Sequence, residues 1–344
     1  MSTRRPATLK EIANRVGVGP ATASVVLNGA KSGTKVSEKT RDAILRAAKE
    51  LNYRPNAVAR SLRKRRTGIV GFFSGYDYIE PRNQYIAEVM SGLQNGCVRH
   101  DLNLLLFTPS SKHAVEDIVA NLADGRLDGL VITARPEHRI NELLAGSHLP
   151  VVAIADRIPE LPSVMADAAQ GGRLQARHLA ERGHRRVLFV PSDYPFPSVI
   201  ERETSFLAEA ESLQITVLHA DPVSGHLDDR IVSPGIRLNL SDKDLSRLTG
   251  PDRVTAVQCW DDTPAYRIAS QIAEYGLRIP DDIAIAGYNG CAPSVEPRWK
   301  LSTVCACWSA VGSAAIDVLS ASIEGGEVPM ETILPVHFVV GSTT

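Results

Sequence analysis

The residues whose types and spacing first suggest a binding function are basic ones gathered at the N-terminal end of the sequence. Up to Arg66 there are 16 Lys and Arg against 4 Asp and Glu, a net charge of +12, whereas the remaining residues carry a net charge of −13. The run Arg63-Lys64-Arg65-Arg66 closes this basic segment and suits phosphate groups. Such segregation indicates a basic module that meets a polyanion, joined to an acidic body that does not.

A helical pattern organises the start of this basic segment, TLKEIANRVGVGPATASVVLN at residues 8–28. Thr8 and Glu11 form a capping box, after which apolar residues recur at helical spacing. Gly17 ends this first helix, and Pro20 suits the first position of a second one. Two short helices joined by a tight turn make a helix-turn-helix, whose second helix can enter the major groove of DNA.

Two further elements complete the predicted N-terminal module. A third helix opens at Ser37, and its apolar residues up to Leu51 can close a core over the first two helices. Pro55 breaks that helix, and Asn56 can cap one more short helical turn. A turn of this length should become ordered only against a partner and DNA.

The segment TLKEIANRVGVGPATASVVLNG, followed by NYRPNAVARSL, resembles the DNA-binding headpiece and hinge of the LacI/GalR family of bacterial transcription regulators. The resemblance implies a three-helix helix-turn-helix headpiece over 1–55 and a hinge helix and linker over 56–67. It also implies that the second helix reads base edges and that Leu62 from each of two protomers wedges into the minor groove. The residues it places against double-stranded operator DNA are Pro20, Ala21, Thr22, Ser24, Val25, Asn28, Lys31, Ala59, Leu62 and Arg63.

The candidate base-reading positions have an unusual chemistry. The side chains of Pro20, Ala21 and Val25 cannot donate a hydrogen bond, which excludes bidentate readout of guanine or adenine at these positions. Apolar contacts with thymine methyl groups remain, together with hydrogen bonds from Thr22 and Ser24. We therefore expect specificity to depend on DNA shape at the hinge and on half-site spacing in a pseudo-palindromic operator.

The size and composition of the chain fit a cytoplasmic protein of several domains. Its 344 residues suffice for two or three domains, and no apolar run approaches the length of a membrane span. The N-terminal residues lack the apolar core of a secretion signal. Five cysteines, an odd number without paired spacing, fit a reducing cytosol. Cys305 and Cys307 stand one residue apart without a histidine cluster nearby, so we expect no metal site there. We also expect no cofactor.

From residue 68 onward, short apolar runs alternate with helical patterns. This alternation predicts an α/β region of two doubly wound lobes, each with a parallel sheet covered by helices. Ligands in such folds bind beyond the carboxyl ends of the strands, which between two lobes means a cleft. The predicted strands are 69–73, 104–107, 130–132, 151–154, 187–190, 216–218, 254–258, 283–286 and 336–340. The predicted helices are 85–99, 114–123, 137–145, 171–182, 200–213 and 264–275.

Resemblance to the LacI/GalR family covers this effector-binding and dimerisation region, 68–344, as well. The blocks that carry it are NQYIA (83–87), GHRRVLFV (183–190), ERETSF (201–206), CWDDTPAYRIASQIAEYGLRIPDDIAIAGYNG (259–290) and LSTV (301–304). They imply lobes similar to periplasmic sugar-binding proteins, joined by three crossovers. The implied first lobe covers about 68–167 and 299–326, and the second about 168–298 and 327–344.

The resemblance also implies the residues that bind a small-molecule effector, namely Arg202, Asp261, Asn289, Ser198, Asp156, Tyr85 and Trp260. Their chemistry supports the assignment, since Asp261 and Asn289 each follow a predicted strand and can bond vicinal hydroxyls. The fork of one Arg can hold a hydroxyl pair. Because a single Arg converges on the site, a neutral sugar or nucleoside-like ligand is favoured over a phosphorylated one. Trp308 is a further candidate for stacking against a ligand.

These observations predict a homodimeric, sequence-specific transcriptional repressor under allosteric control by a small molecule, with no enzymatic activity. An enzyme on the same lobes is disfavoured because the sequence has no Gly-rich phosphate loop after the first strand, no G-x-S-x-G elbow and no His pair at metal spacing. A small-molecule-binding protein without operator-specific regulation is a further alternative, against which the basic segment argues. Gating by a partner protein stays open. Since no heptads follow the last predicted strand, we expect a dimer without an added tetramerisation helix.

Overall fold

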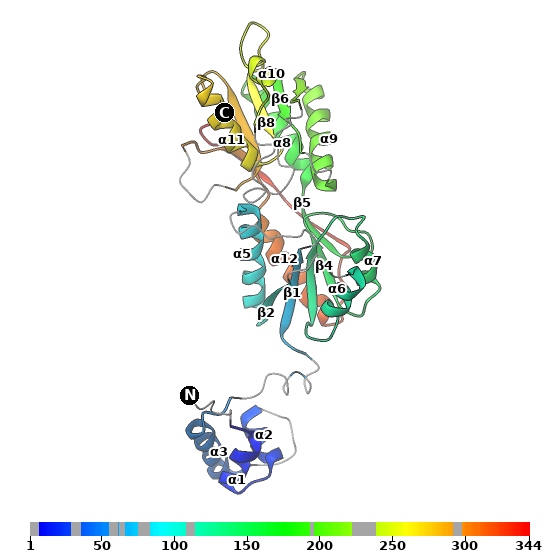
Figure 1. The fold of residues 1–344 in the computed structure, drawn as a ribbon, viewed down its shortest axis with the longest axis vertical. Helices are drawn as coiled ribbons and strands as arrows, with labels where there is room; N and C mark the ends of the chain where they lie inside the picture. The colour runs from blue at the N-terminus through cyan, green and yellow to red at the C-terminus, as the bar shows by residue number, and fades with distance from the viewer. Residues whose placement is uncertain are drawn as a thin grey trace. The chain divides into compact units, whose positions relative to one another are not determined.

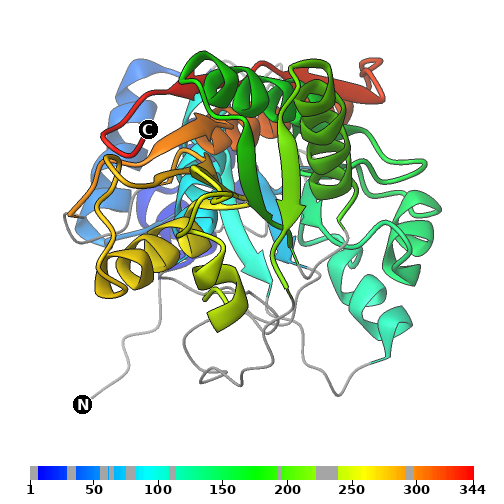
Figure 2. The ribbon, with the colours of Figure 1, turned by 90° about the horizontal axis from the view of Figure 1, so that it is seen from above.

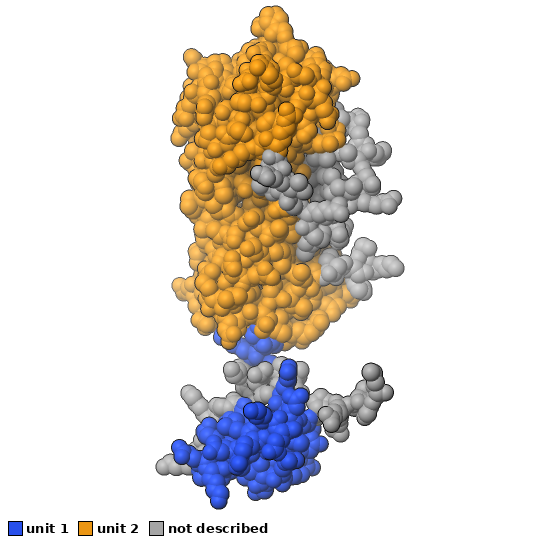
Figure 3. All heavy atoms as spheres, turned by 90° about the vertical axis from the view of Figure 1, so that its left-hand side faces the viewer, with its two compact units in different colours: residues 1–68 blue, residues 69–344 orange. Residues whose placement is uncertain are grey.

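The chain forms two compact units, Met1–Gly68 and Ile69–Thr344 (Figure 3). The computed structural model describes residues 7–28, 36–54, 61, 66–74, 83–107, 114–192, 196–221, 239–291 and 298–344. Among these residues, no helix combines the length and the apolar character needed to cross a bilayer.

The helices of unit 1 are α1 (Leu9–Val16), α2 (Pro20–Asn28) and α3 (Glu38–Glu50). The predicted capping box is present, because Glu11 N donates to Thr8 Oγ1 at 3.3 Å and Thr8 N donates to Glu11 Oε2 at 2.7 Å. Gly17 follows α1 in the left-handed conformation, with a φ of 74°, a conformation that suits glycine and ends helices. Local signals therefore define the turn between the first two helices, as the sequence predicted.

The apolar faces of the three helices meet in one small core. Ile12, Ala23 and Ile44, one from each helix, are fully buried. Val26 and Leu27 of α2 also pack against this core. The predicted three-helix headpiece is thus confirmed. Apart from residue 61 and residues 66–67, the expected hinge helix and linker, 56–67, lie outside the described residues.

The first lobe of unit 2 contains a six-stranded parallel sheet in the order β11-β5-β4-β3-β1-β2. Its strands are β1 (Ile69–Ser74), β2 (Asn103–Phe107), β3 (Gly129–Thr133), β4 (Val151–Ile154), β5 (Ser163–Ala166) and β11 (Glu331–Leu334). The helices are α5 (Gln84–Arg99) and α12 (Trp308–Ile323) on one face, and α6 (Val115–Leu122) and α7 (Arg139–Ala145) on the other (Figure 1). Because both faces are covered, the inner strands consist of continuous apolar runs.

The second lobe repeats this plan with a six-stranded sheet in the order β12-β10-β9-β8-β6-β7. Its strands are β6 (Arg186–Val190), β7 (Thr216–His219), β8 (Ala256–Cys259), β9 (Ala284–Asn289), β10 (Ser302–Cys305) and β12 (His337–Val339). The helices are α8 (Ala168–Glu181) and α9 (Pro197–Ser212) on one face, and α10 (Asp242–Ser246) and α11 (Asp262–Glu274) on the other (Figure 2). Only the short β12 runs antiparallel to its neighbour, β10, in this sheet. The predicted pair of doubly wound lobes is therefore confirmed.

The chain passes between the two sheets three times, after β5, after β10 and after β11. The expected lobe boundaries were wrong at two of these places. They put 299–326 in the first lobe, but β10 pairs with β9 of the second sheet. They put 327–344 in the second lobe, but β11 pairs with β5 of the first sheet. These strands are four residues long, and hydrogen bonds to distant strands, not a local pattern, decide which sheet takes them.

Helices α5 and α12 approach each other closely at two glycines, and this contact yields a stability prediction. A methyl group on Gly92 would clash with the backbone carbonyl of Ser309, and one on Gly312 would lie 2.6 Å from the carbonyl oxygen of Val89. Backbone atoms cannot move aside as a flexible side chain can. We expect Gly92→Ala to lower the free energy of unfolding of unit 2 by about 3 kcal/mol, measured from the midpoint of urea unfolding.

Gly146 offers a matched control for this substitution. It has ordinary right-handed helical angles, with a φ of −78°, and a methyl group added there would lie 3.5 Å from its nearest neighbour. Gly146→Ala should leave the midpoint almost unchanged. If the Gly92 and Gly146 variants unfold at the same urea concentration, the inference that α5 and α12 pack too closely for a methyl group at Gly92 is refuted.

Candidate functional site

The outer face of α2 presents most of the residues that sequence reasoning assigned to DNA. Pro20 and Ala21 are exposed, and Thr22, Ser24 and Val25 are half-buried, while Ala23 faces the core. No acidic residue stands in the first turn of this helix. The face thus offers methyl groups and hydroxyls without negative charge. The other expected DNA contacts, namely the side chain of Asn28 and residues Lys31, Ala59, Leu62 and Arg63, lie outside the described residues.

In unit 2, the predicted pair Asp261 and Asn289 comes together where two neighbouring strands end. Asp261 follows β8 and is the N-cap of α11, and Asn289 is the last residue of β9. Thr263 N donates to Asp261 Oδ1 at 2.7 Å, and Asn289 Nδ2 donates to Asp261 Oδ2. Parallel neighbours β8 and β9 bring both side chains to the same sheet edge, as the sequence predicted.

One aromatic residue of the first lobe contacts this pair, and a second aromatic residue packs against the first. Trp308, the first residue of α12, donates from Nε1 to Asn289 Oδ1 at 2.9 Å. The ring of Tyr85, from α5, meets the Trp308 ring edge-on, with 4.7 Å between centroids. A continuous set of contacts therefore runs from the first lobe to the Asp261–Asn289 pair of the second.

Arg202 supplies a buried positive charge beside the same pair. Its guanidinium lies over the ring of Tyr288, 3.6 Å from the centroid, and Nη1 donates to the carbonyl oxygen of Trp260 at 2.8 Å. Burial lowers the pKa of Arg202, whereas the charges of Tyr288, Asp261 and Asp156 favour the protonated form. Arginine remains charged in proteins, so this guanidinium offsets two buried carboxylates.

Asp156 and Ser198 form a second link between the lobes. Asp156 follows β4 of the first lobe, and Ser198 lies in α9 of the second. Ser198 N donates to Asp156 Oδ1 at 2.8 Å. Burial raises the pKa of Asp156, and the hydrogen bond from Ser198 and the charge of Arg202 oppose that shift. All seven residues of the expected effector set thus fall at one lobe boundary.

Three non-glycine residues at this boundary have positive φ angles. The angles are 75° for Ala155, 109° for Asn289 and 49° for Cys307. Each such conformation costs on the order of 1–3 kcal/mol and persists only where the surroundings enforce it. Ala155 directly precedes Asp156, so the bends at the ends of β4 and β9 help to direct Asp156 and Asn289 toward the boundary.

Two buried donors of this set lack a hydrogen-bond partner among the described residues, Arg202 Nε and Trp260 Nε1. Buried polar atoms are nearly always paired, because leaving one unpaired costs about 1–3 kcal/mol. Both donors belong to residues that touch at the Trp260 carbonyl. An acceptor from another molecule at either donor would therefore be stabilising.

A cavity of about 200 Å³ lies at the same boundary. Ala155 and Met165 of the first lobe and Pro197 and Ser198 of the second are among its lining residues. Ser198 is the expected effector residue that lines it, whereas Arg202, Asp261 and Asn289 lie deeper, each less than a tenth exposed. The cavity reaches the polar set from one side but does not contain it.

Sequence reasoning missed three residues that shape this site, namely Tyr288, Asp262 and Thr303. The ring of Tyr288 packs against the guanidinium of Arg202. Asp262 is buried and accepts from Thr303 Oγ1 at 2.6 Å and from Cys291 N at 2.7 Å. Strand alternation could have flagged Tyr288, because it precedes Asn289 and must face the opposite side of β9. No local signal marks the pairing of Asp262 with Thr303, which joins α11 to β10.

Asp262 yields a pH prediction. Burial raises its pKa well above the ordinary value of 3.8, and the charge of Asp261 adds to the shift. The native state therefore holds a proton that the unfolded chain has released, so stability falls as the pH rises above about 4. Asp262→Asn does not titrate, and its amide can face both partners because the Thr303 hydroxyl can also accept. We expect this variant to be more stable than the parent at pH 7, with the difference vanishing toward pH 4.

Asp282 provides the control of opposite sign. Hydrogen bonds from Arg278 lower its pKa to about 2. Its stabilising effect is present above the unfolded value and is lost as the pH falls toward 2, so Asp282→Asn should reduce stability at pH 7. Urea unfolding at several pH values measures both differences, and a less stable Asp262→Asn at pH 7 would contradict the prediction.

The amino-acid sequence matches three family models. Residues 8–56 match a model described as bacterial regulatory proteins, lacI family, and residues 76–224 match periplasmic binding proteins and sugar binding domain of LacI family. Residues 176–344 match a periplasmic binding protein-like domain. The matches follow the division into a helical unit 1 and a two-lobed unit 2.

Curated relatives align over nearly the whole chain. The HTH-type transcriptional repressor PurR of Proteus mirabilis (strain HI4320) is 30% identical over 333 residues, which are 95% of this chain and 93% of the relative. The ribose operon repressor of Haemophilus influenzae is 28% identical over 331 residues, 95% of each chain.

Solved structures share the fold of the whole chain. The lac repressor dimer bound to operator and the anti-inducer ONPF has a TM-score of 0.79 at 23% identity, covering 98% of this chain and 99% of that one. The complex of the transcriptional regulator CelR with cellobiose has a TM-score of 0.66 at 23% identity, covering 99% and 100%. At this identity the structures establish the fold.

Proposed function

Because the chain belongs to the LacI family of bacterial regulatory proteins, we propose that it binds a pseudo-palindromic operator as a homodimer in the cytoplasm, and that a small neutral molecule bound between the lobes of unit 2 sets its operator affinity. As a family member it is a transcriptional repressor and not an enzyme. Unit 1 supplies the DNA-binding helix, and unit 2 supplies the effector site.

The proposed effector site rests mainly on one observation. Buried donors without hydrogen-bond partners among the described residues lie within a polar set to which both lobes contribute. Arg202 Nε and Trp260 Nε1 require acceptors, and Asp156 and Asp261 have lone pairs that can accept further donors. Trp308 and Tyr85 add aromatic surface from the first lobe. A ligand that satisfies donors of the second lobe while contacting the first would favour one arrangement of the lobes.

The charge balance of the site limits the class of ligand. The described residues place the cation of Arg202 beside two buried carboxylates, Asp156 and Asp261. A phosphate or carboxylate on the ligand would add negative charge to this low-dielectric region, which is costly. A neutral molecule with hydroxyl or amide groups both donates to carboxylates and accepts from Arg202. We therefore propose a sugar or a nucleoside-like compound, a class that includes the cellobiose in the CelR complex.

Control of DNA binding follows from linkage between effector binding and lobe orientation. An effector that binds one arrangement of the lobes more tightly shifts the population toward it, by no more than its differential affinity. We propose that this shift changes the spacing of the two protomers and hence the pairing of their hinge segments, with Leu62 entering or leaving the minor groove. The bases are contacted by the outer face of α2, from Pro20 to Asn28, and the adjoining groove by Ala59, Leu62 and Arg63, with Lys31 just past the helix.

Two experiments in series test this function. A thermal-shift screen of neutral sugars and nucleosides on the full-length protein should identify an effector, because a ligand that binds the native state raises the unfolding temperature. Selection of bound DNA from a random pool, with and without that compound, should then yield a pseudo-palindromic site. If the protein shows no preference among DNA sequences at moderate salt under either condition, the proposed function is refuted.

A further inference from the structure

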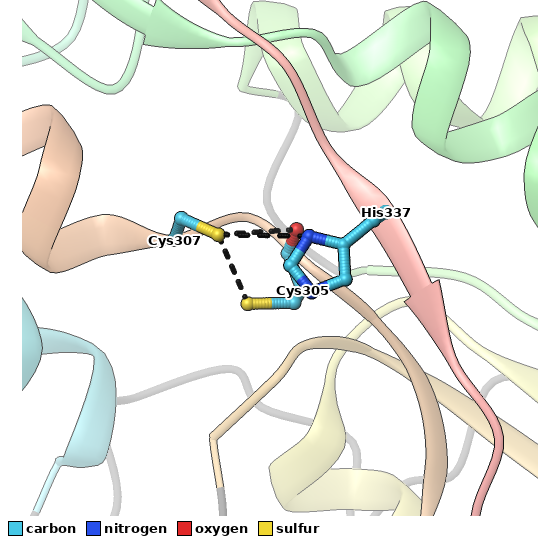
Figure 4. A group of neighbouring side chains, drawn as sticks. All are labelled: Cys305, Cys307 and His337. Carbon is cyan, nitrogen blue, oxygen red and sulfur yellow. Dashed lines mark hydrogen bonds between the residues drawn. The ribbon is translucent and has the colours of Figure 1, made fainter.

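Two cysteines and a histidine converge where the chain crosses between the lobes. Cys305 ends β10, Cys307 is the N-cap of α12, and His337 begins β12. The two Sγ atoms lie 3.2 Å apart, and Cys307 Sγ lies 3.8 Å from His337 Nδ1 (Figure 4). The expectation of no metal site rested on the lack of a histidine near these cysteines in sequence, and that premise is wrong because the fold brings one from 30 residues away.

The topology explains why the three side chains meet. Cys305 and His337 are direct cross-strand partners in the antiparallel pair of β10 and β12, where side chains on one face lie within about 5 Å of each other. Cys307 follows two residues later, in the left-handed conformation with a φ of 49°. This conformation is uncommon for a residue with a side chain, and here it accompanies a thiol placed against that of Cys305.

The distances are close to those of a zinc site. A tetrahedral Zn²⁺ with bonds of about 2.3 Å to sulfur and about 2.0 Å to nitrogen requires about 3.8 Å between sulfurs and about 3.5 Å from sulfur to nitrogen. The two closest pairs differ from these values by about half an ångström, and the third pair, Cys305 Sγ and the His337 ring nitrogen, lies within 4.8 Å and must close to about 3.5 Å. The cysteines are half-buried and His337 is exposed, which leaves the site open to an incoming ion.

We propose that Cys305, Cys307 and His337 bind one thiophilic cation of the Zn²⁺ class, with a fourth position open to solvent. Two thiolates and an imidazole prefer such ions over the hard cations Mg²⁺ and Ca²⁺, which take oxygen ligands. Cys305 and His337 belong to the second sheet, and Cys307 caps a helix of the first lobe. A bound ion would therefore fasten two of the three crossovers to each other and restrain reorientation of the lobes.

Titration of the full-length protein with Co²⁺ and Zn²⁺ tests the site. The reduced protein, stripped with a chelator, should take up one Co²⁺ per chain at these residues and develop the thiolate-to-cobalt charge-transfer absorption. Displacement by Zn²⁺ then reports zinc affinity. We expect Cys305→Ser and Cys307→Ser to abolish the absorption. His337→Asn should weaken zinc binding by more than about tenfold, the loss that even an outer-sphere change can cause.

Matched controls separate this site from other thiols and imidazoles. Cys291→Ser removes a half-buried thiol outside the group, and His219→Asn removes an exposed imidazole. Both should retain the absorption and the zinc affinity of the parent. Since His337 is exposed, His337→Asn should fold normally, and Zn²⁺ should raise the unfolding temperature of the parent more than that of this variant.

Three outcomes would overturn the proposal. The first is the absence of a charge-transfer absorption in the reduced parent protein. The second is an absorption that persists unchanged in Cys307→Ser or is lost equally in Cys291→Ser. The third concerns protein purified with reductant. If its thiol titration finds two fewer free thiols than the sequence contains, and it takes up no metal, the two cysteines form a Cys305–Cys307 disulfide instead.

Discussion

Replacing Ala21 with glutamate is expected to weaken operator binding by at least about a hundredfold, which corresponds to about 2.7 kcal/mol. Ala21 is exposed on the outer face of α2, where we propose that methyl groups meet thymines. A carboxylate there would face the phosphates and the acceptor-rich edges of the major groove, and like charges brought together at an interface cost several kcal/mol. Gel-shift titration of the selected operator at fixed salt measures the change.

The substitution should leave unit 1 folded, which makes the result interpretable. Ala21 is the second residue of α2, whose first turn holds no acid. A negative charge in the first turn of a helix is stabilising, because it complements the helix dipole. The unfolding temperature should therefore be unchanged or slightly higher.

Leu45→Glu is the matched control, since it adds the same charge to the same unit. Leu45 is 47% exposed and lies on α3, not on the helix assigned to the bases. General repulsion of DNA would weaken both variants to the same extent and would count against a reading role for α2. The fold loss of operator affinity in Leu45→Glu should be less than a tenth of that in Ala21→Glu. The salt dependence of its operator binding should be similar to that of the parent.

The elements of unit 1 were predictable because each boundary has a local cause. The capping box at Thr8, the left-handed Gly17 and Pro20 at the start of α2 all act within four residues of one another or of the helix they define. The alternation of strands and helices in unit 2 was readable for a similar reason. Strands buried on both faces form short apolar runs that contrast with amphipathic helices.

Other features depend on contacts that no local pattern encodes. The sequence did not predict helix α12. Small residues on several of its sides allow it to pack closely against α5, and because of them its apolar residues do not form the distinct stripe of an amphipathic helix. The placement of β10 and β11 depends on partners far away in sequence. The convergence of His337 with two cysteines has the same origin.

The candidate effector site was partly predictable. Asp261 and Asn289 could be placed because the carboxyl ends of neighbouring parallel strands share one sheet edge. The contact of Tyr288 with Arg202 could not, since it joins β9 to α9, two elements far apart in sequence. Sequence reasoning therefore found the polar groups of the site but not the aromatic surface that positions their cation.

Arg202→Met is expected to reduce affinity for the effector found by the screen by at least about a hundredfold, since hydrogen bonds to charged groups contribute about 1.5–3 kcal/mol each and more than one is lost. Methionine keeps much of the apolar contact with Tyr288 while removing every donor of the guanidinium. Calorimetric titration measures the affinity. Arg177→Met is the control, because Arg177 is about half exposed and pairs with Glu209 at 2.7 Å on the outside of α8 and α9. An unchanged affinity in the Arg202 variant would remove this residue from the effector site.

The same substitution should destabilise unit 2, and the pH dependence of that loss identifies its cause. Without the guanidinium, the buried carboxylates of Asp156 and Asp261 lose the positive charge that opposes the rise in their pKa. Their pKa values should therefore rise further, so the variant should regain stability as the pH falls from 7 toward 4, and more steeply than the parent. Adding Asp261→Asn to Arg202→Met should restore part of the stability at pH 7 but none of the effector affinity. A loss independent of pH would instead assign the destabilisation to packing against Tyr288.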